Sequence, residues 1–202
     1  MTAPELPEAL RPLTPAGERL VAAASELFYD RGIHAVGVDL IAEVAETTKK
    51  TLYDRFGSKE GLVVLYLQRR QHRWREFVSR HLDEMSVDRR PPWGPLGVLD
   101  ALELWMAEQS RGCAFVNAYA ELGGSDHPGV EVIRSEKQWT QRLYRRLCEE
   151  DGLPEPEQLA AAVHLVHEGV LVLATAGAQP DAFAHGRRTV EQLLAAAAGQ
   201  DR

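Results

Sequence analysis

Residues 41–62 decide the architecture of this chain, and they read IAEVAETTKKTLYDRFGSKEGL. Two short helices are predicted here, separated by the three-residue turn 46–48. Thr48 carries the hydroxyl of a good N-cap for the second helix, and Gly57 is placed to end that helix. Ser58 is expected to cap the helix that follows.

Each short helix has its apolar residues on one face. Ile41, Val44 and Ala45 are expected to face inward from the first helix. Leu52 and Phe56, four residues apart, are expected to do so from the second. A helix of about eight residues is not stable in water by its own propensity. It must therefore pack on its neighbours, which predicts a helix-turn-helix unit.

A further helix is predicted upstream of this pair. It begins near Thr14, with Pro15 at the first helical position, where the missing N–H costs nothing. Gly32 ends it. Residues 1–13 hold three prolines and no apolar period, so we expect a loose arm there. The buried face of the helix is formed by Leu20, Ala24, Leu27 and Phe28.

Downstream, the pattern is helical to the end of the chain, with no period-2 strand signal. A long helix over about 59–82 turns Leu62, Leu65 and Tyr66 inward. The expected fold is all-α with about nine helices: a helix-turn-helix domain over 14–62 and a helical C-terminal domain over 83–202. The remaining helices are predicted at about 95–110, 113–122, 128–150, 156–176 and 181–198.

Charge is unevenly placed along the chain. The whole chain carries a net charge of −7, yet residues 47–75 hold eight basic and two acidic side chains, a net +6. The other 173 residues are therefore net −13. A compact basic patch on an acidic protein favours local binding of a polyanion. The alternative is an arginine-rich solvated helix face.

The core Thr-Leu-Tyr-x-x-Phe-x-Ser-Lys-x-x-Leu at 51–62 resembles the DNA-binding domain of the TetR (tetracycline-repressor-like) family of bacterial regulators, and the similarity extends over about 14–65. The resemblance implies that Thr48 caps the recognition helix and approaches a phosphate, and that Lys50 and Thr51 point at base edges. Tyr53 and Lys59 would contact phosphates. The full set implied to contact DNA is Thr48, Lys49, Lys50, Thr51, Tyr53, Arg55 and Lys59.

Three residues depart from the family pattern. Glu46 stands where the turn usually carries glycine, and a non-glycine residue in a left-handed turn costs about 1 kcal/mol. Val38 replaces a hydroxyl residue often found near the start of the second helix. Asp54 lies on the recognition helix, where it either accepts from a cytosine amine or repels phosphate.

The 156–176 helix is apolar nearly all round, which requires burial on both sides. With the 181–198 helix it is expected to form a four-helix bundle across a twofold axis. A dimer is also what reading two half-sites about 34–36 Å apart requires. A monomer with a fully internal helix is the alternative. The expected interface residues are Leu159, Val163, Val166, Val170, Phe183, Val190 and Leu194.

A small-molecule effector site is expected between helices of the C-terminal domain. Its candidates are Trp105, Phe115, Asn117, Tyr119, Trp139, Leu143, His164 and His167, although for any one of them core packing is the more common role. His164, His167 and Glu168 share a helix face, which leaves a metal-dependent enzyme as a competing hypothesis. A DNA-binding protein without an effector is another, and Cys113 is a candidate redox sensor.

These features indicate a cytoplasmic, homodimeric, ligand-responsive repressor that binds an operator in double-stranded DNA. No resident metal or other cofactor is implied. Two unpaired cysteines suit a reducing compartment, and no signal peptide is visible. The longest apolar region, 160–178, is interrupted by His164, His167 and Glu168, so no membrane span is expected.

Overall fold

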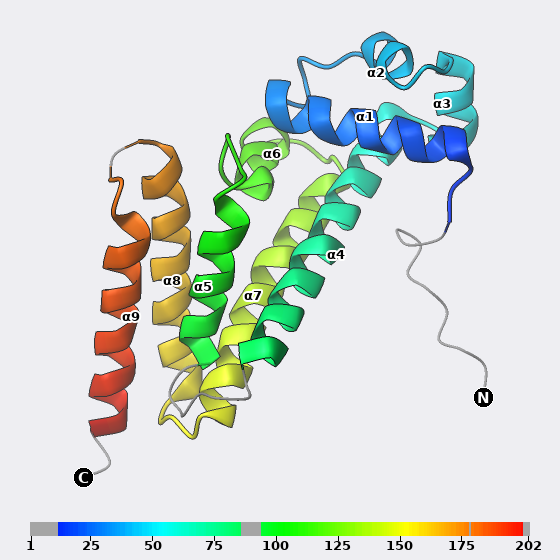
Figure 1. Ribbon diagram of the computed structural model, residues 1–202. Helices are drawn as coiled ribbons and strands as arrows, with labels where there is room; N and C mark the ends of the chain where they lie inside the picture. Colours follow the sequence, from blue (N-terminus) through cyan, green and yellow to red (C-terminus); the bar gives the residue numbers. More distant parts are fainter. Residues whose placement is uncertain (1–11, 86–93, 178, 200–202) are drawn as a thin grey trace, which may run out of the picture. The chain divides into compact units, whose positions relative to one another are not determined.

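The computed structural model describes residues 12–85, 94–177 and 179–199 (Figure 1). Within these ranges the chain is all-α, as predicted, and each helix begins and ends close to its expected bounds. The helices are α1 (Pro15–Arg31), α2 (Val38–Val44), α3 (Lys49–Phe56), α4 (Lys59–Met85), α5 (Gly94–Met106), α6 (Ala114–Leu122), α7 (Gly129–Glu150), α8 (Pro156–Thr175) and α9 (Ala182–Gly199).

Side-chain caps set the starts of three helices. The Thr14 hydroxyl accepts from the backbone N–H of Gly17 at 3.3 Å, at the start of α1. Thr48 accepts from the N–H of Thr51 at 3.1 Å, and Ser58 accepts from the N–H of Gly61 at 3.0 Å. Each cap satisfies a donor that has no partner within its helix, so the starts predicted from these hydroxyl residues are confirmed.

The chain folds into two compact units. Unit 1 contains the described part of residues 1–73 together with 114–134, and unit 2 contains the described part of 74–113 and 135–202. The linear division expected from the sequence does not coincide with these units, because α6 belongs to unit 1 although it lies far along the chain. Both α4 and α7 contribute residues to each unit.

The core of unit 1 is built where α1, α2 and α3 pack on one another. Leu20, Ile41 and Leu52 are completely buried, one from each helix. Val44 is a correction to the predicted face: its side chain is 49% exposed, while Ala45 is buried. The inward face of α2 is formed by Ile41, Ala42 and Ala45, and Val44 at the last helical position turns outward.

Unit 2 is held by a continuous apolar core to which α4, α5, α7, α8 and α9 all contribute. In unit 2, α8 and α9 pack on each other and lie side by side (Figure 1). Gly186 of α9 makes that approach possible, since a Cβ there would lie 2.2 Å from Cγ2 of Val170.

The expected interface residues need correction, because most of them are already buried by their own unit. Only Val166 and Phe183 keep partial exposure. The exposed apolar residues of α8 are instead Leu165, Val172 and Leu173, which lie on its other side. Those already buried are Leu159, Val163, Val170, Val190 and Leu194.

By length and composition alone, α8 is long and apolar enough to cross a membrane. The expectation that its histidines and Glu168 exclude a membrane span is therefore wrong on these two criteria. A third of its apolar window is buried inside the protein (33%). One such helix is weak evidence for a membrane span, because a core or interface helix of a soluble protein has the same composition.

A buried polar pair links α7 to α8 inside unit 2. The Tyr144 hydroxyl lies 2.9 Å from Nδ1 of His167, and both side chains are almost completely buried. Burial lowers the pKa of His167 to about 3 and raises the pKa of Tyr144 well above its usual value. His167 is therefore neutral in the folded protein throughout the physiological range.

This burial predicts a loss of stability on acidification. Below pH 6.5 the unfolded chain takes up a proton at His167 that the folded chain refuses until about pH 3. Stability is fully present above pH 6.5, and between pH 6.5 and 5 this group removes about 2 kcal/mol of unfolding free energy. Denaturant unfolding across that range measures the slope.

His167→Gln should be less stable at pH 7 and should flatten the pH dependence. His185→Gln, which changes an exposed histidine on α9, should leave the slope unchanged. An unaltered slope in His167→Gln would contradict the assignment.

Candidate nucleic-acid interface

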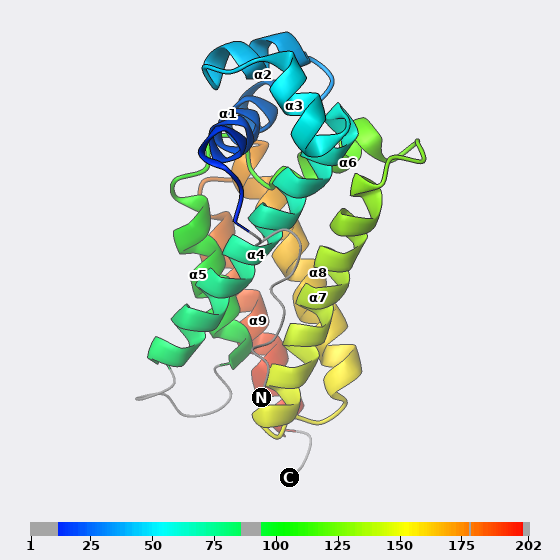
Figure 2. The same cartoon turned by 90° about the vertical axis from the view of Figure 1, so that its right-hand side faces the viewer.

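The helix α3 buries one face and exposes the other. Leu52 packs inward, whereas the side chain of Lys50 is 82% exposed and that of Tyr53 is 48% exposed. Arg55 is exposed as well, and Thr51 is partly so. Figure 2 shows α3 beside α2, with the short turn between them. The outward face therefore presents basic, hydroxyl and phenolic groups from a single helix.

Acidic neighbours hold both lysines of α3. Nζ of Lys50 donates to Oδ2 of Asp54 at 2.6 Å, one turn further along the helix. Lys49 forms an ion pair with Asp39 of α2. Both pairs are solvent-exposed, so each contributes little to stability and is easily exchanged for another anion.

The turn between α2 and α3 adopts the left-handed conformation that usually favours glycine. Glu46 has φ +49°, and its N–H donates to the carbonyl of Glu43 at 3.0 Å. The next N–H, that of Thr47, donates to Ala42 at 2.9 Å. The turn thus keeps the geometry expected of this motif, at a cost of about 1 kcal/mol for the non-glycine residue.

The basic window 47–75 is not one patch. Arg69 forms two hydrogen bonds with Glu18 of α1, and the guanidinium of Arg70 lies 4.8 Å from the centre of the Tyr29 ring. In unit 2, Nε of Arg75 donates to Glu136 at 2.9 Å. These three arginines hold helices together, which corrects the expectation of a compact basic patch. The exposed basic face of α3 is formed by Lys49, Lys50 and Arg55.

Lys59 lies at the start of α4, and its side chain is partly buried. Its Nζ donates to the carbonyl of Ile33 at 2.6 Å. Burial lowers the pKa of Lys59, and the charge of Glu121 opposes that shift. The lysine that the resemblance assigns to a phosphate thus fastens the α1–α2 connection in this structure.

Glu121 is a positioning residue that the sequence did not reveal. From α6, its carboxylate accepts from the N–H of Ile33 at 2.8 Å and from that of His34 at 2.6 Å. Gly32, with φ +90°, makes room for it, since a Cβ there would lie 3.0 Å from the Glu121 carboxylate. The carboxylate thus ties α6 to the connection that leads into α2. Only the glycine was visible in advance, as a helix end.

The predicted effector residues divide between the two units. Phe115 is buried in unit 1, and Asn117 and Tyr119 belong to the same unit. Trp105 packs against the rings of Trp74 and Phe77 in unit 2. The members of the predicted set that lie in unit 2 are Trp105, Trp139, Leu143, His164 and His167.

Glu168 is the centre of a polar cluster between α7 and α8. Lys137 donates to it at 2.7 Å, and Nε2 of His164 lies 3.2 Å from it. Burial alone would raise the pKa of Glu168, but His164 and Lys137 together lower it to about 2. Nδ1 of His164 lies 2.8 Å from the Gln141 side chain, so both of its ring nitrogens have partners.

Among the residues that the structure describes, no three His, Cys, Asp or Glu side chains gather as metal ligands. His167 pairs with Tyr144, whereas His164 and Glu168 pair with each other and with α7. The set proposed for a metal-dependent enzyme therefore forms a network that satisfies itself.

Comparison with known proteins gives a consistent result. Residues 20–65 match the profile of the family described as bacterial regulatory proteins, tetR family. The HTH-type transcriptional activator FasR of Mycolicibacterium smegmatis is 33% identical over 150 residues, which are 74% of this chain and 52% of FasR. The repressor DhaR of a Mycobacterium species is 28% identical over 142 residues, 67% of each chain. This chain thus spans about half the length of FasR.

Solved structures agree along nearly the whole chain. A TetR-family transcriptional regulator from Streptomyces coelicolor superposes with a TM-score of 0.81 at 24% identity, covering 91% of this chain and 96% of that one. A tetR-type regulator from Streptomyces avermitilis gives 0.76 at 29% identity, covering 92% and 98%. The relatives are named as regulators of transcription, not as enzymes.

The Glu121 contacts predict a local effect of mutation. Glu121→Ala removes an acceptor shared by two amides, and each hydrogen bond to a charged group contributes about 1.5–3 kcal/mol. We therefore expect the Ile33 and His34 amides to exchange with solvent at least tenfold faster, as measured by hydrogen exchange.

Glu121→Gln keeps one acceptor oxygen and should give an intermediate rate. Glu131→Ala, an exposed acid on α7, is the control and should leave both amides protected. Unchanged protection in Glu121→Ala would show that the carboxylate does not hold the connection.

Proposed function

Because this chain belongs to the TetR family of bacterial regulatory proteins, we propose that it is a transcriptional regulator that binds a DNA operator as a homodimer. The observation that carries the proposal is the exposed face of α3. Lys50 lies opposite the buried Leu52, and Thr51 and Tyr53 lie on the two flanks of the exposed face. A helix held in this way fits the major groove of duplex DNA.

Each exposed group of α3 has a suitable role at such a groove. Lys50 and Thr51 reach base edges, and Tyr53 and Arg55 reach flanking phosphates. Lys50 must first leave Asp54, which lies 2.6 Å away. Because the exposed pair is weak, a DNA phosphate or a guanine edge displaces the carboxylate at little cost. Asp54 then opposes binding, since its charge remains next to DNA.

An exposed stripe on α8 supports the homodimer. Leu165 is 75% exposed, Val172 51% and Leu173 37%. Gly169 lies between them, and a Cβ there would meet nothing within 4 Å. The opposite side of α8 is buried in the core of unit 2. A second copy of the same helix, related by a twofold axis, would bury this stripe and complete a four-helix bundle with the two α9 helices.

We further propose that a small-molecule effector controls DNA binding, with the free protein acting as a repressor. The support lies in α4, a single helix that carries residues of both units. A ligand among the helices of unit 2 that displaces α4 also displaces the start of that helix. Only two residues join the end of α3 to the start of α4, so α3 would move as well. We expect the protein to act in the cytoplasm, where its operator is.

The DNA-binding proposal predicts opposite effects from two variants of one ion pair. Lys50→Ala removes a groove contact and should weaken operator binding by about 5- to 150-fold, the equivalent of about 1–3 kcal/mol for a base contact. Asp54→Asn releases Lys50 and removes a repelling charge, so it should strengthen binding. Gel-shift or anisotropy titration against a genomically selected operator measures both.

Arg146→Ala, an exposed arginine on α7, is the control and should bind like the wild type. Affinity of the wild type should fall steeply between 50 and 200 mM salt, because phosphate contacts release counterions. If the single variants Lys50→Ala and Tyr53→Phe both bind the operator with wild-type affinity, α3 is not the recognition helix.

The dimer proposal predicts that Leu165→Asp is monomeric and folded. A charge in the centre of an apolar interface is left without a partner on association, whereas in the monomer this position is already in water. Light scattering after size exclusion should show half the mass. Leu104→Asp changes an equally apolar side chain, 56% exposed on α5, and should stay dimeric. A dimeric Leu165→Asp would place the interface elsewhere.

A further inference from the structure

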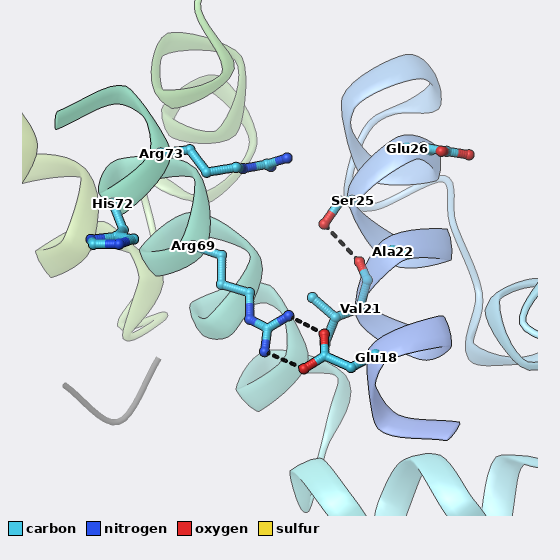
Figure 3. A pocket seen from close by; sticks show the side chains of 8 residues that line it. All are labelled: Glu18, Val21, Ala22, Ser25, Glu26, Arg69, His72 and Arg73. Atoms are coloured by element: carbon cyan, nitrogen blue, oxygen red, sulfur yellow. Dashed lines mark hydrogen bonds and ion pairs between the residues drawn. The ribbon is translucent and has the colours of Figure 1, made fainter. Parts of the chain in front are cut away.

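A cleft lies inside unit 1, between α1 and α4, away from the recognition helix. Its volume is about 480 Å³, within the range of small-molecule sites. Figure 3 shows Arg69 closing one end through Glu18, and Arg73 reaching from α4 towards α1. The lining residues from α1 are Glu18, Val21, Ala22, Ser25 and Glu26, and those from α4 are Arg69, His72 and Arg73.

The positive charge of this cleft is only partly neutralised. Glu18 pairs with Arg69, and Arg70 lies behind it over the Tyr29 ring. Within the residues that the structure describes, Arg73 has no carboxylate in contact with its guanidinium. Burial, together with the charges of Arg70 and Arg69, lowers the pKa of Arg73. An anion at this place would relieve the repulsion among the three guanidinium groups.

DNA binding does not account for Arg73. It lies fourteen residues after Lys59, the first residue of α4. At 1.5 Å per residue that is about 21 Å along the helix from the end that adjoins α3. Nor does Arg73 join two helices, as its neighbours Arg69 and Arg75 do.

The surroundings indicate which kind of anion fits. Two carboxylates, Glu18 and Glu26, border the cleft and disfavour a ligand with several negative charges. Val21 and Ala22 give it an apolar wall, and the hydroxyl of Ser25 already donates to Val21 at 2.6 Å. A guanidinium binds a carboxylate through two parallel hydrogen bonds, which a single ammonium does not provide.

We propose that this cleft is a binding site for an organic monocarboxylate, with the carboxylate on Arg73 and a compact apolar group against Val21 and Ala22. The ligand bridges α1 to α4 and stabilises unit 1 by mass action. The site is separate from the effector site proposed among the helices of unit 2. The test of this proposal is also independent of the proposed DNA binding, because ligand binding is measured in the absence of DNA.

The test uses the full-length protein labelled with ¹⁵N, and benzoate as the probe. Benzamide, which lacks the charge, and inorganic phosphate, which carries more charge and no apolar group, are the comparison probes. NMR titration follows the Arg73 Nε–Hε signal and the amides of Ala22 and Ser25. We expect saturable benzoate binding at these signals, with at least tenfold weaker binding of benzamide and phosphate.

Three variants locate the site. Arg73→Ala should abolish saturable binding, and Arg73→Lys should weaken it several-fold because the paired hydrogen bonds are lost. Arg134→Ala, which removes an exposed arginine of α7 in the same unit, should bind like the wild type. Non-saturating shifts, equal binding of phosphate, or unchanged affinity in Arg73→Ala would each overturn the proposal. Loss of operator binding in Lys50→Ala with intact benzoate binding would separate the two functions.

Discussion

The packing of α3 through Leu52 is the constraint on which the helix-turn-helix unit of α1, α2 and α3 depends. An eight-residue helix has too few internal hydrogen bonds to be stable alone, so α1 and α2 must hold it. That dependence has a functional consequence. The same packing that buries Leu52 turns Lys50 and Tyr53 outward, and a rigid support keeps an exposed polar face in one orientation.

The basic residues of unit 1 have two roles, contacts within the protein and exposure to solvent, and they alternate along the sequence. Contacts within the protein are made by Arg69 with Glu18, by Arg70 with the Tyr29 ring, and by Lys59 with a backbone carbonyl. The lysines of α3 face water in weak pairs. Partly buried cations need partners because desolvation is costly, whereas exposed cations remain free to exchange theirs. Arg73 belongs to neither group, because it is partly buried and has no carboxylate in contact with it among the described residues. This is why we propose an anionic ligand in its cleft.

In unit 2, the helix α8 is apolar on nearly all sides, but only one of its sides is buried by the rest of the unit. One side, with Val163 and Val170, enters the core of its own chain, and the other side leaves Leu165 and Val172 in water. Periodicity predicted burial on two sides, and the structure confirms it for one; burial of the other side stays a prediction, and the exposed residues there are not those expected from the sequence. Sequence spacing defines the faces of a helix, but only the positions of α5, α7 and α9 show which face the core occupies.

The sequence by itself determined the helical content, the helix starts at Thr14, Thr48 and Ser58, and the motif of α2 and α3, because caps and apolar periods act over a few residues. The tertiary structure alone decided the role of Glu121, which meets Ile33 across 88 positions of sequence. It likewise decided which arginines hold helices together and that His167 is buried with Tyr144. Such contacts depend on where distant helices come to rest, and no local pattern encodes that.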